Sequence, residues 1–409
     1  MGLVKPGIWI IISGITTLVT ISYIIISFEE YQITDSEHNV FLNKIYDYVN
    51  ENSKDTKKII SYLLAEAETK QTRLGFLKPD NERQKIRETY AKIGQKIDIN
   101  LHQNGEFQQQ IKEIKILFQK NKKLSTFINL LSNLILNQFY LLTFAKNLNR
   151  SLLFLERETY LIALKEINLL IESYSLINNT SLQDGISPHI FYNLRSLAHF
   201  RYMLENISDT DQFIEEIRNI FKQDLDVAIS YEPKNPYSYM QKSYMFLQIS
   251  KKITDYKEKE RYLVEAEIFA KKSYELAPKD PGAINSIGLC YQERENYQAA
   301  FYYFSEALIL LPNNPALLHN MARICLKLGK PLKDNDYFQK AYSYSADALR
   351  IKPNDILILT IAAEAAAKLK KCQESKDILE KIKVICDRYN TCKDHSEIFS
   401  KDNQTFKCQ

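Results

Sequence analysis

Residues 281–312 read PGAINSIGLCYQERENYQAAFYYFSEALILLP, two apolar helical segments bounded by prolines. Counted from Pro281, small residues occupy places eight, twenty and twenty-seven (Gly288, Ala300 and Ala307). Aromatic residues occupy places eleven and twenty-four (Tyr291 and Phe304), and a proline, Pro312, occupies place thirty-two. Small side chains let two antiparallel helices cross closely, and a proline cannot continue the second helix. The stretch therefore predicts a closely packed helix pair.

Proline-bounded turns recur on both sides of this stretch. They lie at Pro233–Pro236, Pro278–Pro281, Pro312–Pro315 and Pro353, and Pro278 and Pro312 are 34 residues apart. A period of this length indicates an array of stacked helix pairs.

The neighbouring units keep part of the pattern. The unit at Pro315 has seven extra residues around 330–336 and then keeps Ala341, Ala348 and Pro353 in register. The unit at Pro236 has about eleven extra residues near 251–261. We expect both sets of extra residues to form loops. Further helix pairs are expected at 187–233 and 356–385.

In all but the opening aromatic residue, the stretch from Pro281 resembles the tetratricopeptide-repeat (TPR) superfamily. The resemblance covers about residues 187–385. It implies a right-handed α-solenoid whose concave face binds a peptide or partner helix. The first helix of each unit lines that face, which implies that a partner contacts Asn285, Leu289, Gln292, Glu293, His319, Asn320, Arg323, Leu326, Lys327, Thr360 and Glu364.

The chemistry of this implied groove is mixed. Chaperone-docking members of the superfamily clamp a carboxylate with lysines, asparagines and often an arginine, but here only Asn320 and Arg323 resemble that set. Arg323 and Lys327 stand one helical turn apart. They can either pair with an acidic ligand or form an ordinary solvated face.

Composition supports an all-α protein. The 409 residues include only 10 glycines, and none of these spells a nucleotide-binding GxGxxG or GxxxxGK[ST] loop. The formal net charge is +4, too small to indicate a nucleic-acid partner. No HExxH or GxSxG motif is present, so we expect no enzyme and no cofactor.

The N-terminal region predicts a membrane anchor. Residues 7–28 form a 22-residue stretch without charge, long enough to span a bilayer as a helix. It is too long for a cleaved signal peptide, and Pro6 excludes a myristoylation signal. Lys5 precedes the stretch and Glu29 follows it, so residues 1–6 are expected in the cytoplasm and the body in the periplasm of a bacterium, at the inner membrane.

Residues 35–179 predict a helical bundle. We expect a break at Gly105 and a linker from Asn178 to Pro188. Residues 124–145 also lack charge, but Asn129, Asn133 and Asn137 recur every four residues opposite a leucine-rich face. That pattern favours an amphipathic helix over a second membrane span.

Two kinds of cysteine are present. Cys290 and Cys325 fall inside repeat helices, where small core residues are expected. Cys372, Cys386, Cys392 and Cys408 lie in or near a tail at 386–409, and export would permit disulfides among them, with Cys386–Cys392 favoured. A zinc site is the alternative, but no CxxC occurs, so we expect no metal.

These features predict a membrane-anchored scaffold that docks other proteins in an envelope assembly, such as a flagellar motor, secretion or pilus machine. A homo-oligomer is compatible with this prediction. Two alternatives stay open: a receptor whose bundle binds a ligand, and a docking platform that faces the cytoplasm. The residues before the span are too few for a cytoplasmic output domain, which disfavours the receptor.

Overall fold

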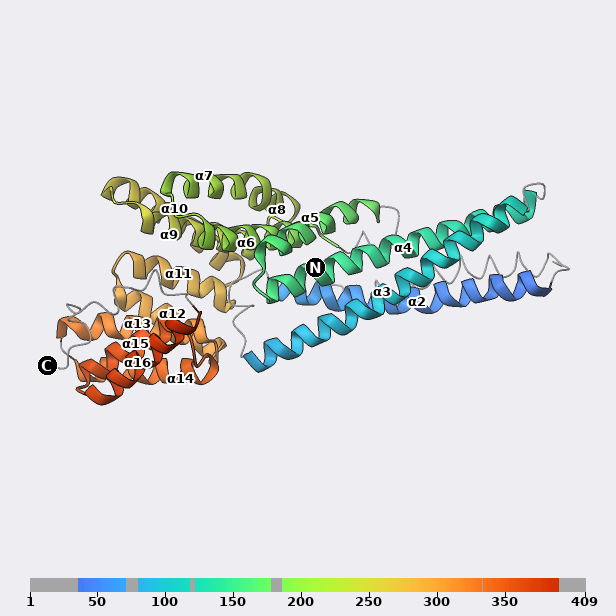
Figure 1. Ribbon diagram of the computed structural model, residues 1–409. Coiled ribbons are helices and arrows are strands. Elements are labelled where there is room, and N and C mark those ends of the chain that lie inside the picture. Colours follow the sequence, from blue (N-terminus) through green and yellow to red (C-terminus); the bar gives the residue numbers. More distant parts are fainter. Residues whose placement is uncertain (1–35, 71–79, 118–121, 178–185, 333, 390–409) are drawn as a thin grey trace. The chain divides into compact units, whose positions relative to one another are not determined.

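The structure is a computed structural model that describes residues 36–70, 80–117, 122–177, 186–332 and 334–389. The described residues form helices joined by turns, so the predicted all-α class is confirmed (Figure 1). The chain divides into two compact units, residues up to 68 with 86–199, and residues 69–85 with 200 onward. We describe each unit by itself.

The first unit contains three long antiparallel helices: α2 (Ser36–Thr69), α3 (Asp80–Leu117) and α4 (Lys122–Glu156) (Figure 1). Their apolar stripes are buried, including Ile45, Ile60 and Leu63 of α2. The buried hydroxyl of Tyr48 donates to the carbonyl oxygen of Asn100 at 2.5 Å. This contact fixes the register of α2 against α3.

Buried polar side chains also fix the register of α4. Gln138 Nε2 donates to Thr56 Oγ1 at 3.0 Å, and Asn104 Nδ2 donates to the Ile135 carbonyl oxygen at 3.2 Å. Asn149 Nδ2 donates to the Tyr90 carbonyl oxygen at 3.0 Å. A buried donor without a partner destabilises the fold, so each bond favours this one alignment over a slipped one.

The predicted helix break at Gly105 is wrong, because α3 runs through it without interruption. A glycine inside a helix costs about 1 kcal/mol relative to alanine, which the packing of a 38-residue helix outweighs. The amphipathic prediction for α4 is confirmed. Its polar stripe of Asn129, Asn133 and Asn137 is exposed, while Leu141 and Leu142 are buried.

The first unit continues with α5 (Tyr160–Leu176), which packs against α4, and it ends within α6 (His189–Asn206). Most of the predicted linker at 178–188, and the predicted span at 7–28, lie outside the described residues. Among the helices that the structure does describe, none is long and apolar enough to cross a membrane.

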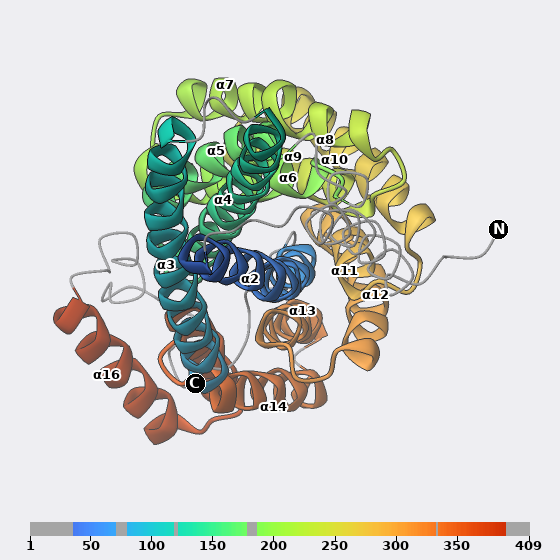
Figure 2. The ribbon, with the colours of Figure 1, turned by 90° about the vertical axis from the view of Figure 1, so that its right-hand side faces the viewer.

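The second unit is a succession of helices in which each packs on the next (Figure 2). A continuous helical segment comes first, made of α7 (Thr210–Ile220), the π-helix η3 (Phe221–Leu225) and α8 (Asp226–Tyr231). Four helix pairs follow: α9 (Pro236–Lys252) with α10 (Tyr256–Leu276), α11 (Pro281–Glu293) with α12 (Tyr297–Leu310), α13 (Pro315–Leu332) with α14 (Asn335–Ile351), and α15 (Ile356–Lys368) with α16 (Cys372–Tyr389).

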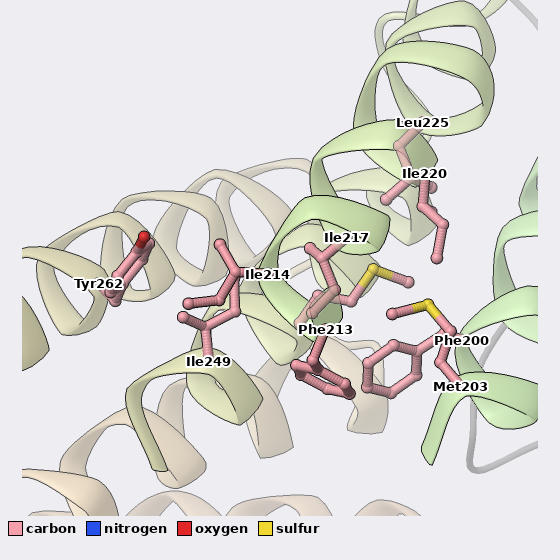
Figure 3. Close-up of a cluster of buried hydrophobic side chains, with 10 residues drawn as sticks. Phe200, Met203, Phe213, Ile214, Ile217, Ile220, Leu225, Ile249 and Tyr262 are labelled. Carbon is pink, nitrogen blue, oxygen red and sulfur yellow. The ribbon is translucent and has the colours of Figure 1, made fainter. Parts of the chain in front are cut away.

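An apolar cluster joins the beginning of this unit to its first pair. Figure 3 shows Phe200 and Met203 of α6 facing Phe213 and Ile217 of α7. Met245 and Ile249 of α9 and Tyr262 of α10 complete the same cluster. The cluster therefore continues from the segment before Pro236 into the helix pairs.

The same turn connects each pair to the next. The backbone N–H groups of Asn235, Asp280, Asn314 and Asp355 each bond the carbonyl oxygen three residues before them. The side chain of each of these four residues then caps the following helix. Proline occupies the first helical position after three of them, where its missing N–H has no partner to lose.

The extra residues of two units lengthen helices, which corrects the expected loops. α9 continues to Lys252 and α10 begins at Tyr256, so only three residues of the stretch 251–261 are outside a helix. α13 continues to Leu332, and α14 begins at Asn335. Additional helical turns satisfy backbone groups within the helix itself, whereas a loop would need other partners for them.

Candidate partner-binding face

The crossing of α11 and α12 depends on Gly288. A Cβ atom at this position would lie 2.5 Å from Cε1 of Phe304, too close for any real contact. Ala300, Phe304 and Ala307 are fully buried around the crossing. The rings of Tyr291 and Tyr303 stack at 5.4 Å across the same two helices. The absent side chain of Gly288 therefore makes room for the ring of Phe304.

The next two pairs cross in related ways. In α13 and α14, the fully buried Ala322 and Ala341 lie in one cluster with Phe338, and Ala348 is also buried. In α15 and α16, Ser375 Oγ donates to the Ala363 carbonyl oxygen at 2.8 Å. Pro312 and Pro353 follow the ends of α12 and α14 and are exposed.

The turn inside a pair is also repeated. Glu295 and Lys370 take positive φ values of 58° and 61°, and the next residue, Asn296 or Lys371, donates its N–H to the carbonyl oxygen five residues earlier. Glu158, between α4 and α5, has a φ of 59°, and the residues around it form the same backbone hydrogen bonds. The turn between α4 and α5 therefore matches those of α11–α12 and α15–α16.

The residues around this turn extend the match. When Glu158 is aligned with Glu295, the residues in place of Gly288, Tyr291, Ala300 and Phe304 are Ser151, Phe154, Ala163 and Ile167. Ser151, Ala163 and Ile167 are fully buried. The sequence analysis placed this pair in the helical bundle because no proline marks it. The α4–α5 pair therefore matches the repeated helix pairs both in the turn that joins its helices and in the residues at the helix crossing.

Repeated helix pairs, with one turn inside the pair and another between pairs, define a TPR-like helical repeat protein. Each pair packs mainly on its neighbours in sequence, as in other helical-repeat proteins.

Three solved structures illustrate the likeness of fold, two of them of TPR proteins. A thermophilic TPR protein from Thermus thermophilus, TTC0263, is 17% identical over 53% of this chain and 96% of its own, with a TM-score of 0.37. PilF of Pseudomonas aeruginosa is 13% identical over 50% and 88%, with a TM-score of 0.35. The C-terminal part of a TPR repeat-containing protein from Cytophaga hutchinsonii is 15% identical over 75% and 99%, with a TM-score of 0.34.

These low TM-scores carry no argument of their own, and the class rests on the turns and crossings described above. No protein-family model matches the sequence, and no curated protein sequence matches it.

The predicted groove residues lie along α11, α13 and α15, the first helices of three successive pairs. We call the surface formed by these helices and by α9, the first helix of the pair before them, the first-helix face. Its members are tied to one another across neighbouring helices. Asn320 Nδ2 of α13 donates to Asn285 Oδ1 of α11 at 2.9 Å. Within α11, Gln292 Nε2 also donates to the carboxylate of Glu293 at 3.1 Å.

Two ion pairs cross between first helices. Lys251 Nζ of α9 lies 3.2 Å from Glu293 Oε1 of α11, and Lys330 Nζ of α13 lies 2.7 Å from Glu364 Oε1 of α15. Both carboxylates are mostly buried, so a lysine from the adjacent helix compensates the charge of each. Glu293 and Glu364 therefore link neighbouring pairs.

Lys251 and Lys330 were not predicted as groove residues, because both lie in stretches that were expected to form loops. Each is the sixteenth residue counted from the proline of its unit, Pro236 or Pro315. A lysine at the same place in two lengthened units is the sequence signal that could have found them.

The side chains of the other predicted groove residues differ in how exposed they are. Leu326 is buried in the cluster with Phe338, so its expected contact with a partner is wrong. Gln292 and Asn320 are each only 8% exposed. Leu289, Thr360, His319 and Arg323 are partly buried, and the hydroxyl of Thr360 donates to the Ile356 carbonyl oxygen. Lys327 is exposed, with Nζ 6.0 Å from the centroid of the Tyr297 ring.

The cysteines fall into the two expected groups. Cys290 and Cys325 are free and buried, and burial raises the pKa of each thiol to about 12. Such thiols are unreactive at neutral pH. Cys372 and Cys386 are both disulfide-bonded. Cys392, the predicted partner of Cys386, lies outside the described residues, and the described residues contain no cluster that could hold a metal ion.

Proposed function

We propose that this protein is a non-enzymatic, membrane-anchored scaffold that docks other proteins of a bacterial envelope assembly through its first-helix face. The observation that carries the proposal is the stack of helix pairs, which presents side chains of four successive first helices side by side. Flagellar motors, secretion machines and pilus machines are the kinds of assembly that we have in mind. They come from the resemblance stated above.

The charged side chains of the first-helix face favour one kind of partner. The first-helix face carries four cationic side chains, Lys251, Arg323, Lys327 and Lys330, but only two anionic ones, Glu293 and Glu364. The two carboxylates are already paired with lysines. The excess of positive charge favours a partner segment with acidic residues. Lys327 is exposed and, unlike Lys251 and Lys330, forms no ion pair with any described residue.

Export of the body is part of the proposal. Disulfides persist in oxidising compartments, and Cys372 and Cys386 are both disulfide-bonded. The charge asymmetry around residues 7–28 favours the same orientation. A reporter that is active only in an oxidising compartment, fused to the C-terminus, tests it. Activity would support export, and silence from a stably expressed fusion would contradict it.

The docking function is tested by crosslinking in cells. A photo-crosslinking amino acid in place of Lys327 should give discrete adducts with other envelope proteins. The same amino acid in place of Lys376, which is exposed on α16, is the matched control. Lys327→Glu should weaken the association of the recovered partner. Equal adducts at both positions, or none at either, would contradict docking at the first-helix face.

A further inference from the structure

The outer side of α5 carries an apolar stripe that no described residue covers. Leu161, Ile162, Leu169 and Leu176 are each between 42% and 53% exposed. At 3.6 residues per turn they fall within roughly 100° of the helix circumference and span about 22 Å of its length. The opposite side, with Ala163, Ile167 and Leu170, is fully buried. α5 is thus apolar on both sides, although only one side packs against other described residues.

Two charged residues lie within this stripe. Lys165 and Glu172 are exposed and stand seven residues apart, so both point to the same side of the helix. The structure shows no ion pair for either of them among the described residues. The buried carboxylate of α5 belongs to Glu166, which pairs with Arg150 at 2.6 Å.

The order of residues along the stripe is self-complementary. If a second α5 lies antiparallel on the first with the two-fold axis between Asn168 and Leu169, then Lys165 of each copy faces Glu172 of the other, and the two Leu169 side chains lie beside the axis. Leu161 and Ile162 of each copy then face Leu176 of the other. One alignment therefore pairs every apolar residue with an apolar residue and both lysines with glutamates. A two-fold axis requires a surface that matches itself in this way.

We propose that the α5 stripe is the contact between two copies of this chain, which associate through an antiparallel α5–α5 pair about a two-fold axis near Leu169. The occupant of the stripe is a second copy because its charges complement those of the first. A contact of one helix on one helix is small, so the association is weak and depends on concentration. This inference does not depend on the proposed docking function.

Charge reversal tests the pairing. Two differently tagged copies of the full chain are co-expressed, and the amount of one that co-purifies with the other is measured. With Lys165→Glu in both copies, or Glu172→Lys in both, like charges face each other twice, and co-purification should fall about tenfold, which corresponds to about 1.4 kcal/mol.

The decisive measurements combine the two charge-reversal substitutions. When Lys165→Glu in one copy meets Glu172→Lys in the other, both ion pairs form again, one of them with reversed sign, and association should return. The doubly reversed chain, Lys165→Glu with Glu172→Lys, should also associate with itself. Lys92→Glu, at an exposed site on α3, is the control and should leave co-purification unchanged.

Crosslinking tests the register. Leu169→Cys should form a disulfide between copies with itself. Leu161→Cys should crosslink to Leu176→Cys and not to itself. A chain that does not self-associate overturns the proposal, as does association that neither charge reversal alters. Self-crosslinking of Leu161→Cys would overturn the antiparallel arrangement.

Discussion

The three long helices α2–α4 and the helix pairs α9–α16 are held together by different means. Polar side chains that bond across the buried interface align the long helices, as with Thr56 and Gln138. Small residues that face large ones align the pairs, as with Gly288 and Phe304. The first arrangement selects a register through hydrogen bonds, and the second through shape.

This difference explains why the helix pairs α9–α16 were easier to predict from the sequence than the packing of the long helices α2–α4. Gly288 and Phe304 are 16 residues apart and recur with a period, so the sequence itself shows their relation. Gln138 and Thr56 are 82 residues apart, and nothing local marks them as partners. Shape complementarity within one repeat can be predicted from sequence, whereas a polar contact between distant helices cannot.

The largest effect is expected from removing the large member of the shape-based contact. Phe304→Ala should lower the free energy of unfolding by about 3–5 kcal/mol, because it leaves a cavity in a fully buried site. Chemical denaturation measures the change. Tyr302→Ala, two residues earlier and 58% exposed, is the control and should change stability by less than about 0.5 kcal/mol. Equal losses in both variants would show that Phe304 does not organise the crossing.

Glycine-to-alanine substitutions should have opposite signs in the two regions. Gly288→Ala should destabilise by about 1–3 kcal/mol, because the new Cβ atom meets the ring of Phe304. Gly105→Ala meets no atom within 4 Å and should stabilise α3 by about 0.5–1 kcal/mol. Thermal unfolding of both variants tests the comparison. The double variant Gly288→Ala with Phe304→Leu should lose less stability than the sum of the losses in the two single variants.

The polar contact between long helices should behave in a non-additive way. Thr56→Val alone should cost about 1–2 kcal/mol, because it leaves the buried Gln138 amide without its acceptor. Thr56→Val combined with Gln138→Leu should cost less than Thr56→Val alone. A double-mutant cycle in denaturant measures the coupling. Strictly additive losses would mean that the hydrogen bond does not align α2 and α4.

The smallest effect concerns the cap of α11 and depends on pH. Burial raises the pKa of Asp280, although its bonds to backbone N–H groups oppose the shift. A carboxyl group whose pKa is higher in the folded state destabilises the fold as pH rises above its unfolded value near 3.8. Asp280→Asn keeps a capping oxygen and cannot ionise. Its melting temperature relative to the unchanged protein should therefore rise between pH 3 and 7, and a difference independent of pH would contradict this.

Much of the fold could be predicted from sequence, and less of the candidate site. The pairs from Pro236 onward could be predicted because prolines and small residues mark every boundary. The α4–α5 pair was assigned to the bundle because Glu158 supplies its turn without a glycine or a proline to mark it. On the first-helix face, positions could be predicted, but the ion pairs of Glu293 and Glu364 could not, because their lysines come from helices longer than the repeat predicts.

The stacking of pairs also has a mechanical consequence. Among the described helices, α16 packs chiefly on one neighbour, α15, so within this part of the chain it is expected to detach early under tension. The two disulfide-bonded cysteines of the described chain, Cys372 and Cys386, both lie on this helix. Disulfide bonding at these two residues therefore adds a covalent restraint to a helix that packing among the described residues holds on one side only.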